Sequence, residues 1–273
     1  VGDVKTFCGV GRKGAVPSLL LSSSPKPLKE SEVTLPTALC FDGNRMFISQ
    51  NARHCILVAT SGMVSLFAGH SDPIEKSDWS SKTESKSLKP YERWRGCKNG
   101  PRLQAEFDCP HGLCMSPNGD ILVADSGNHC IRAISETNVR TIVGIGTQAG
   151  FLDGDIQTAL LHFPTDVAAI NDRLYICDSA NHCIRMLIGT TLSTVAGNGS
   201  GGFSNGFLQS SQLYFPSALC LGNEGEIYVA DTSNNAIRVV REVTGHAKTT
   251  IPTAAPSSFQ SPSFCAMQHL ADE

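Results

Sequence analysis

Three copies of an Asp-x-x-Asn tetrad carry the side chains in this chain that are best suited to chemistry. Each copy places a carboxylate three residues before an amide and seven residues before a guanidinium. Such a set could act in general acid–base catalysis or hold a metal ion through its oxygens. The three sets are Asp125, Asn128 and Arg132; Asp178, Asn181 and Arg185; and Asp231, Asn234 and Arg238.

The regular spacing of the copies favours a structural role over a catalytic one. Each tetrad begins 53 residues after the one before it, and a degenerate copy occupies residues 50–57. A single pocket needs one set of catalytic groups, whereas a repeated fold needs one set in every unit. Each aspartate ends an apolar run, so its carboxylate is predicted to accept backbone N–H groups in the following turn. We interpret His129 and His182, which follow two of the tetrads, in the same way.

Four strand signals make up each repeat. An apolar run of strand length precedes the tetrad, a turn signal precedes that run, and a proline opens another apolar stretch upstream. Two more strand-like stretches follow the tetrad. No helical periodicity is evident and the runs are apolar throughout, so we predict an all-β propeller whose four-stranded blades cover each other's faces. The predicted blades are approximately 36–70, 110–146, 164–199 and 216–251.

The residues around the tetrads resemble NHL repeats. The resemblance rests on Val-Ala-Asp-Ser-Gly-Asn-His-Cys-Ile-Arg at 123–132 and Val-Ala-Asp-Thr-Ser-Asn-Asn-Ala-Ile-Arg at 229–238. The tails at 141–146 and 194–199 are similar to the variant found in bacterial and thioredoxin-fused NHL proteins. The resemblance covers nearly the whole chain and implies a protein- or RNA-binding platform, with enzymes as a minority. The fold alone does not identify a functional site, so the resemblance leaves the function open.

The two ends of the chain suggest an incomplete ring. Residues 4–11 match the last strand of a blade, and residues 259–265 match an opening strand. Because the family usually closes with six blades, we expect residues 1–273 to form part of a larger propeller, with four full blades and partial terminal ones. The alternative is a fifth blade that both termini share.

Charge and hydropathy narrow the choice of partner. The formal net charge is −3, from 22 basic and 25 acidic residues, and no basic patch is evident. Nucleic acid is therefore a disfavoured partner. No apolar run has the length of a membrane span, and the first residues resemble neither a signal peptide nor an initiator.

The eleven cysteines follow the repeat more than a disulfide pattern. At three repeat positions cysteine alternates with alanine, as expected of a small buried residue. Equivalent positions in successive blades lie too far apart for a bridge. We therefore expect free thiols and a reducing, cytoplasmic location. The sequon at 198–200 points instead to secretion.

His111 is the one candidate residue outside the repeat pattern. It follows Pro110, where other blades have Thr37, Thr165 and Ser217. The peptide-amidating lyases, which resemble NHL propellers, bring histidines from several blades onto a channel zinc. That resemblance makes His111 a minor metal candidate. Other propeller hydrolases hold calcium or zinc with acidic and amide side chains in the channel, and Asp166 is the only acid near the start of a predicted inner strand. A zinc site needs at least three convergent ligands, so no metal is expected.

No other cofactor signal survives inspection. The glycine-rich stretches 9–14 and 197–202 match a dinucleotide fingerprint, but neither follows a parallel strand and opens a helix. Both stretches fall where one predicted blade joins the next. We interpret them as connectors and expect no cofactor.

Two insertions interrupt the repeats, at 15–34 and 71–98. The second is either a solvated loop or an arm that binds a partner, because aromatic and arginine side chains commonly anchor interfaces. Its candidate contacts are Trp79, Tyr91, Arg93, Trp94 and Arg95. The sequence therefore favours a non-enzymatic protein-interaction scaffold. The alternative is a propeller lyase or hydrolase that uses a channel-bound zinc or calcium.

Overall fold

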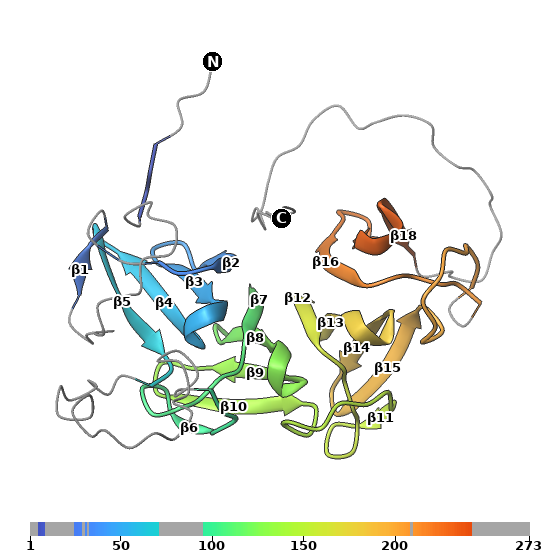
Figure 1. Cartoon of the computed structure of the whole chain (residues 1–273), viewed down its shortest axis with the longest axis horizontal. Helices are drawn as coiled ribbons and strands as arrows, with labels where there is room; N and C mark the ends of the chain where they lie inside the picture. Colours follow the sequence, from blue (N-terminus) through green and yellow to red (C-terminus); the bar gives the residue numbers. More distant parts are fainter. Residues whose placement is uncertain are drawn as a thin grey trace, which may run out of the picture.

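The chain forms four antiparallel sheets that follow one another around a common centre, like the blades of a propeller (Figure 1). The computed structural model describes residues 5–8, 25–28, 31, 33–70, 95–207 and 210–241. Within them the secondary structure is strands and 3₁₀ turns, with no α-helix. The predicted all-β propeller is confirmed. No helix in the described residues is long and apolar enough to cross a membrane.

Each complete blade has four antiparallel strands in sequential order. The first comprises β2 (Pro36–Phe41), β3 (Met46–Gln50), β4 (Cys55–Thr60) and β5 (Met63–Ala68). The second comprises β7 (Pro110–Met115), β8 (Ile121–Asp125), β9 (Cys130–Ile134) and β10 (Asn138–Val143). The third comprises β12 (Pro164–Ile170), β13 (Arg173–Asp178), β14 (Cys183–Ile188) and β15 (Thr191–Ala196). The fourth sheet has β16 (Pro216–Leu221), β17 (Ile227–Asp231) and β18 (Ala236–Val240).

A short fifth strand lies at the outer edge of three sheets. These strands are β1 (Lys26–Pro27), β6 (Gly100–Pro101) and β11 (Gly154–Asp155), and each pairs with the last strand of its blade. The sequence predicted only four strands per blade. The difference arises because the connector that enters a blade first runs along its outer edge before the chain turns inward.

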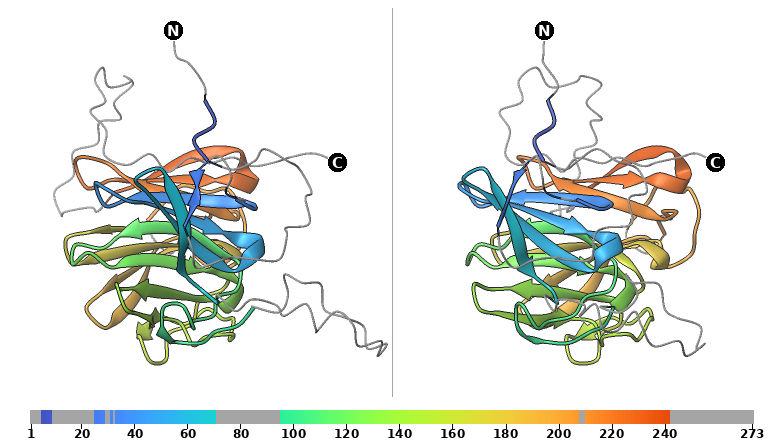
Figure 2. Two further views of the ribbon diagram at one scale, coloured as in Figure 1. Left: turned by 90° about the vertical axis from the view of Figure 1, so that its left-hand side faces the viewer. Right: turned by 60° about the vertical axis from the view of Figure 1, so that its left-hand side comes forward.

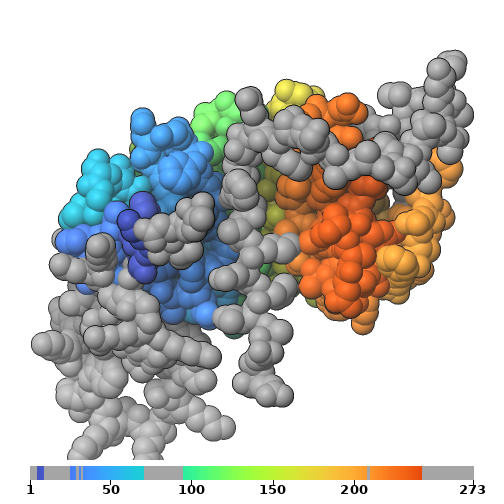
Figure 3. All heavy atoms as spheres, turned by 90° about the horizontal axis from the view of Figure 1, so that it is seen from above, coloured from blue at the N-terminus to red at the C-terminus, as the bar shows by residue number. Residues whose placement is uncertain are grey.

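The innermost strands β2, β7, β12 and β16 face the centre of the arc (Figure 1). Seen from above, the first and fourth blades lie on opposite sides of the molecule (Figure 3). The fourth strand expected for the last blade, up to residue 251, lies outside the described residues, as does the opening strand expected at 259–265. Of the predicted strand at 4–11, only residues 5–8 are described, and they form no strand.

The hydrophobic core lies between blades rather than within a single layer. One cluster joins Phe47 and Phe67 of the first blade to Leu113 and Val123 of the second, and two further clusters join the second blade to the third and the third to the fourth. Every residue of β3, β8 and β9 is buried. Burial on both faces explains why these runs are apolar throughout instead of alternating.

A 3₁₀ turn follows the second strand of every blade. The turns are η2 (Asn51–Arg53), η5 (Ser126–Asn128), η6 (Ser179–Asn181) and η7 (Thr232–Asn234). Seen edge-on, η2 and η7 lie on the same side of the arc (Figure 2), which we call the turn face. The repeated polar residues of the tetrads therefore gather at this face.

Candidate functional site

The tetrad of the second blade forms a buried cluster of hydrogen bonds at the turn face. Asp125 ends β8, and one carboxylate oxygen accepts the backbone N–H of Asp108 at 2.7 Å. The other oxygen accepts Asn128 Nδ2 at 2.9 Å and Arg132 Nη1 at 2.8 Å. The side chains of Asp125 and Arg132 are 0% exposed. We call each such Asp–Asn–Arg set a clasp.

The same geometry recurs in the next two blades. Asp178 accepts the backbone N–H of His162 at 2.7 Å and is bonded to its own Asn181 and Arg185. Asp231 accepts the backbone N–H of Tyr214 at 2.7 Å and is bonded to Asn234 and Arg238 in the same way. Each of these carboxylates finds its partners within its own blade or the chain entering it, so the three do not share a ligand.

The clasps also hold the connectors that lead into each blade. Asn128 Nδ2 donates to Gly96 O at 2.6 Å, and Arg132 Nη2 donates to Lys98 O and Asn99 Oδ1 at 2.9 and 2.8 Å. The matching acceptors in the third blade are Gly150 O, Leu152 O and Asp153, and in the fourth blade Gly202 O, Ser204 O and Asn205. A Gly-x-x-Asn/Asp-Gly pattern at 96–100, 150–154 and 202–206 is thus a second repeated motif that the sequence analysis missed.

Burial opposes ionisation of the clasp carboxylates. It raises the pKa of Asp125 to about 6, against the lowering effect of Arg132 and Asn128, and it raises the pKa of Asp178 as well. At neutral pH Asp125 is still ionised and paired with Arg132. A carboxylate whose oxygens already accept three hydrogen bonds is poorly placed to act as a base.

A histidine after the turn joins each blade to the next. His54, His129 and His182 adopt left-handed backbone conformations, with φ of 52°, 56° and 54°. Their Nδ1 atoms accept the backbone N–H groups of Cys109, Phe163 and Phe215, respectively, at 2.9, 3.0 and 3.2 Å. Each of those residues precedes the proline that opens the next blade. In the fourth blade Asn235 takes the left-handed position, with φ of 52°.

We predict that replacing His54 by Asn lowers the pH dependence of stability. Burial lowers the pKa of His54, and Nδ1 can accept the Cys109 N–H only while the ring is neutral. The hydrogen bond therefore stabilises the folded state fully above the His54 pKa of the unfolded chain, about 6.5. This stabilisation is lost as the pH falls through the lower His54 pKa of the folded protein. Thermal unfolding between pH 8 and pH 5 should show wild type losing its advantage over His54→Asn in that window.

The quantity to compare is the difference in stability between wild type and His54→Asn at each pH. The difference is needed because protonation of Asp166 changes the stability of both proteins in the opposite direction. Burial raises the pKa of Asp166 to about 7, so its contribution is greatest at low pH and is lost as the pH rises through that value. His70→Asn serves as the control because His70 does not occupy a left-handed position after a turn. If the His54 variant keeps the full pH profile of wild type, the interblade role of the imidazole is wrong.

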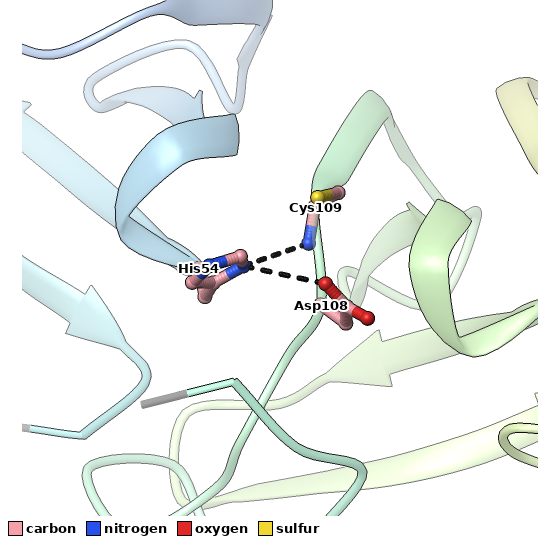
Figure 4. Close-up of side chains that lie close together, drawn as sticks. All are labelled: His54, Asp108 and Cys109. Carbon is pink, nitrogen blue, oxygen red and sulfur yellow. Dashed lines mark hydrogen bonds and ion pairs between the residues drawn. The ribbon is translucent and has the colours of Figure 1, made fainter. Parts of the chain in front are cut away.

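A group of possible metal ligands lies where the first and second blades meet (Figure 4). The ligand atoms of His54, Asp108 and Cys109 all lie within 4.8 Å of one another. His54 Nδ1 is 3.6 Å from Asp108 Oδ1, while Asp108 Oδ2 accepts Arg95 Nε at 2.6 Å. Within the described residues Asp108 Oδ1 is buried and has no hydrogen-bond partner.

The chemistry of this group does not suit a nucleophile or a metal. Burial and the neighbouring Asp108 raise the pKa of Cys109 to about 11, so the residue is a thiol at neutral pH rather than the reactive thiolate. The Nδ1 lone pair of His54 is already used by the backbone, and Arg95 brings a positive charge to the carboxylate. We interpret the group as part of the blade junction.

The candidate metal ligands of the central channel, His111 and Asp166, do not form a shared metal site either. His111 lies half-buried on β7, and none of the possible metal-ligand groups found among the described residues includes it. Asp166, on β12, is buried and accepts the backbone N–H groups of Val167 and Leu219, both at 2.9 Å. The Asp166 carboxylate packs against Gly112 of the preceding blade, where a side chain would collide with it.

Two exposed aromatic side chains lie against His182, the residue that follows the turn η6. The His182 ring lies 4.5 Å from Phe215 and 5.3 Å from Tyr214, measured between centroids. Gly199 and Gly201 complete the surface, because a Cβ atom there would come within 2.7 Å of the Phe151 ring and the Tyr214 ring, respectively. The exposed members are Phe151, Phe203, Tyr214 and Phe215, which we call the aromatic surface.

The aromatic surface rests on the clasps. Phe151 lies over the Arg185 guanidinium at 5.1 Å and Phe203 over that of Arg238 at 4.8 Å. Phe203 is nevertheless 65% exposed. The sequence favours the arm at 71–98 as the partner-binding site instead. Trp79, Tyr91, Arg93 and Trp94 lie outside the described residues, whereas Arg95 is 59% exposed and pairs with Asp108.

Comparison with known proteins agrees with the repeat pattern. A model of the NHL repeat matches residues 107–134, 161–186 and 213–240. The three matches contain the three clasps in full. The degenerate copy of the first blade is not among them.

The chain is also similar to three longer proteins. It is 28% identical over 255 residues to protein SUPPRESSOR OF QUENCHING 1, chloroplastic, of Arabidopsis thaliana, across 87% of this chain and 22% of that protein. It is 32% identical over 154 residues to NHL repeat-containing protein 2 of Homo sapiens, across 50% and 21% of the two chains. The probable peptidyl-alpha-hydroxyglycine alpha-amidating lyase pgal-1 of Caenorhabditis elegans is 27% identical over 154 residues, across 55% and 42%.

These alignments span about a fifth of the first two relatives and less than half of the third. They support the resemblance that the sequence suggested. Together with the four antiparallel sheets and the three matched repeats, they show that the chain belongs to the NHL-repeat β-propeller family.

Proposed function

We propose that this chain is a non-enzymatic scaffold that binds protein partners through the turn face of the propeller. The observation that carries the proposal is the aromatic surface of Phe151, Phe203, Tyr214 and Phe215. Large aromatic side chains are enriched at protein interfaces and supply much of their binding energy. Tyr214 and Phe215 lie together with ring centroids 5.2 Å apart, and Phe151 adjoins Gly199, two residues from the Gly201 that adjoins Tyr214. Such neighbouring exposed rings are more than isolated surface apolar residues would explain.

A rigid frame supports this role. The clasps tie each blade to its connector, and the histidines at the left-handed positions tie each blade to the next. Aromatic side chains held on such a frame lose little conformational freedom on binding. The net charge of −3 makes a protein a better partner than a nucleic acid, and the proposal requires no cofactor.

The arm at 71–98 is a second proposed contact. Its candidate anchors Trp79, Tyr91, Arg93 and Trp94 precede Arg95, which is held against the second blade by Asp108. An arm held at that point would end beside the second blade, on the same frame that carries the aromatic surface.

A photo-cross-linking amino acid at Phe203 tests the proposal in cells. We expect light-dependent adducts with a partner protein from this position and none from Phe41, an exposed phenylalanine of the first blade. With the captured partner purified, Tyr214→Ala should weaken binding by roughly tenfold or more, as truncation of a buried aromatic anchor does. Equal adducts from both positions, or none from Phe203, would reject the aromatic surface as the docking site.

The second candidate is a propeller lyase or hydrolase with a channel-bound zinc or calcium. His111 on β7 and the similarity to the probable lyase of C. elegans favour it. Elemental analysis of the purified protein separates the two functions. One equivalent of zinc or calcium that disappears in His111→Ala would support the enzyme and overturn the scaffold.

We further propose that the chain works in a thiol-reducing compartment. None of the ten described cysteines forms a disulfide, which supports the cytoplasm expected from the sequence. The relative from A. thaliana is chloroplastic by name, so an organelle is the alternative. Fluorescent tagging of the full-length protein would distinguish the two compartments.

A further inference from the structure

Cys97 breaks the pattern of the connectors. It follows Gly96, whose carbonyl accepts a hydrogen bond from Asn128, as Phe151 follows Gly150 and Phe203 follows Gly202 in the next two blades. In those blades the phenylalanine lies over the clasp arginine. A cysteine at the same position cannot serve that packing role. A departure from the repeat suggests a feature that belongs to the second blade alone.

The Cys97 thiol lies against a second thiol. Cys130, the first residue of β9, forms a side-chain hydrogen bond with Cys97, and the two sulfur atoms lie within 4.8 Å of each other. Gly146 makes room for the pair, because a side chain there would collide with the Cys97 sulfur. Closing a bridge requires side-chain rotation that brings the two sulfur atoms from this separation to about 2.05 Å.

The two thiols differ in solvent exposure and in pKa. Cys97 is half-buried, whereas Cys130 is fully buried. The hydrogen bond from Cys130, together with the nearby Arg132, lowers the pKa of Cys97. The same hydrogen bond and burial raise the pKa of Cys130, against the lowering effect of Arg132. Asp125, the third polar group nearby, already accepts three hydrogen bonds. The arrangement is that of an attacking and a resolving cysteine rather than of a metal site.

We propose that Cys97 and Cys130 form a reversible redox site that exchanges with small disulfides of the glutathione type and closes an intrablade disulfide. This site is independent of partner binding at the aromatic surface. The bond would fix the connector 95–101 to the first residue of β9.

The exchange is balanced by one molecule of glutathione disulfide. The Cys97 thiolate attacks one sulfur of that disulfide, which breaks the S–S bond and releases a glutathione thiolate. Cys130 then attacks the Cys97 sulfur of the mixed disulfide, and its proton passes to the second glutathione as that thiolate leaves. The protein loses two thiol hydrogens and two electrons, and one glutathione disulfide becomes two glutathiones.

The test equilibrates the native protein in glutathione buffers from fully reduced to fully oxidised, followed by acid quenching, alkylation and peptide mass spectrometry. We expect a peptide linking Cys97 to Cys130 in oxidising buffer, which disappears on return to reducing buffer. The oxidised protein should melt roughly 5–10 °C higher than the reduced protein, because the bridge restricts the unfolded chain.

Two single variants establish the order of attack. In Cys130→Ala, which introduces the residue found at position 236 of the fourth blade, Cys97 should retain a mixed disulfide with glutathione. In Cys97→Ser, Cys130 should stay unmodified for as long as the fold is intact by circular dichroism.

Cys183→Ala is the matched control. Cys183 is the buried counterpart of Cys130 in the third blade, where Phe151 takes the place of Cys97. This variant should form the Cys97–Cys130 bridge as wild type does. Failure to obtain the linked peptide from the folded protein, or glutathione attached to Cys130 as readily as to Cys97, would overturn the proposal.

Discussion

Replacing Asp125 by Asn should lower the free energy of unfolding by about 3–5 kcal/mol, as removal of one partner from a buried ion pair does. Arg132 is 0% exposed and would keep its charge without a counterion. The new amide would also point N–H groups at Arg132 and Asn128, which are themselves donors. Chemical denaturation of wild type and variant gives the difference directly.

Asp120→Asn is the control for this substitution. Asp120 pairs with Arg140 at 2.7 Å, but the Arg140 side chain is 55% exposed, and exposed pairs contribute less than about 1 kcal/mol. Asp178→Asn should behave like Asp125→Asn, because its clasp has the same partners and burial. Losses below 1 kcal/mol for both clasp variants would contradict a structural role for the clasps.

Replacing Gly144 by Ala should lower the free energy of unfolding by about 2–4 kcal/mol, the combined effect of backbone strain and overpacking. Gly144 follows β10 with φ of 93°, and a Cβ atom would lie 2.5 Å from His129 O and 2.8 Å from the Cys130 Cα. Both contacts are with backbone, so no side chain can move away. The clash is therefore with the strand that follows the clasp.

Gly119→Ala isolates the strain from the clash. Gly119 has a similar φ of 88°, but a Cβ atom there would meet nothing within 4 Å. We expect a loss of about 1 kcal/mol, which reflects the conformation alone. Thermal or urea unfolding of both variants gives the comparison, and equal losses would show that the close approach at Gly144 is unimportant.

The repeat made the fold predictable from the sequence. Three tetrads at one spacing identified the second and third strands of each blade, and prolines such as Pro110 and Pro164 identified the first. The outer strands β6 and β11 were missed, because two residues of a connector carry no periodicity. Their only sequence signal is the glycine that opens each one.

The partners of the repeated side chains could be predicted only in part. The aspartates were expected to accept backbone N–H groups in the turn after them. Asp125 instead accepts the N–H of Asp108, which precedes it in the chain. The partner of His129 belongs to the next blade, so it depends on how blades pack rather than on local sequence.

The aromatic surface and the thiol pair escaped sequence reasoning for one physical reason. Phe151, Phe203 and Cys97 occupy one position of the connector motif, which varies in sequence outside its glycines and its Asn or Asp. The repeat alignment groups Cys130 with the cysteines at the same position of other blades, and it gives no sign that Cys97 lies beside it. Cys97 is distant in sequence, and the clasp brings the two together.

Hydrogen exchange at the amides of Asp108, His162 and Tyr214 tests most directly whether the clasps are structural. Each of these amides donates to a clasp carboxylate, so we predict that all three exchange slowly in the native protein. Asp125→Asn should speed exchange at Asp108 first, while His162 and Tyr214 stay protected. Exchange at the rate of an unstructured peptide in wild type, or a change at all three amides when zinc or calcium is added, would contradict a structural role.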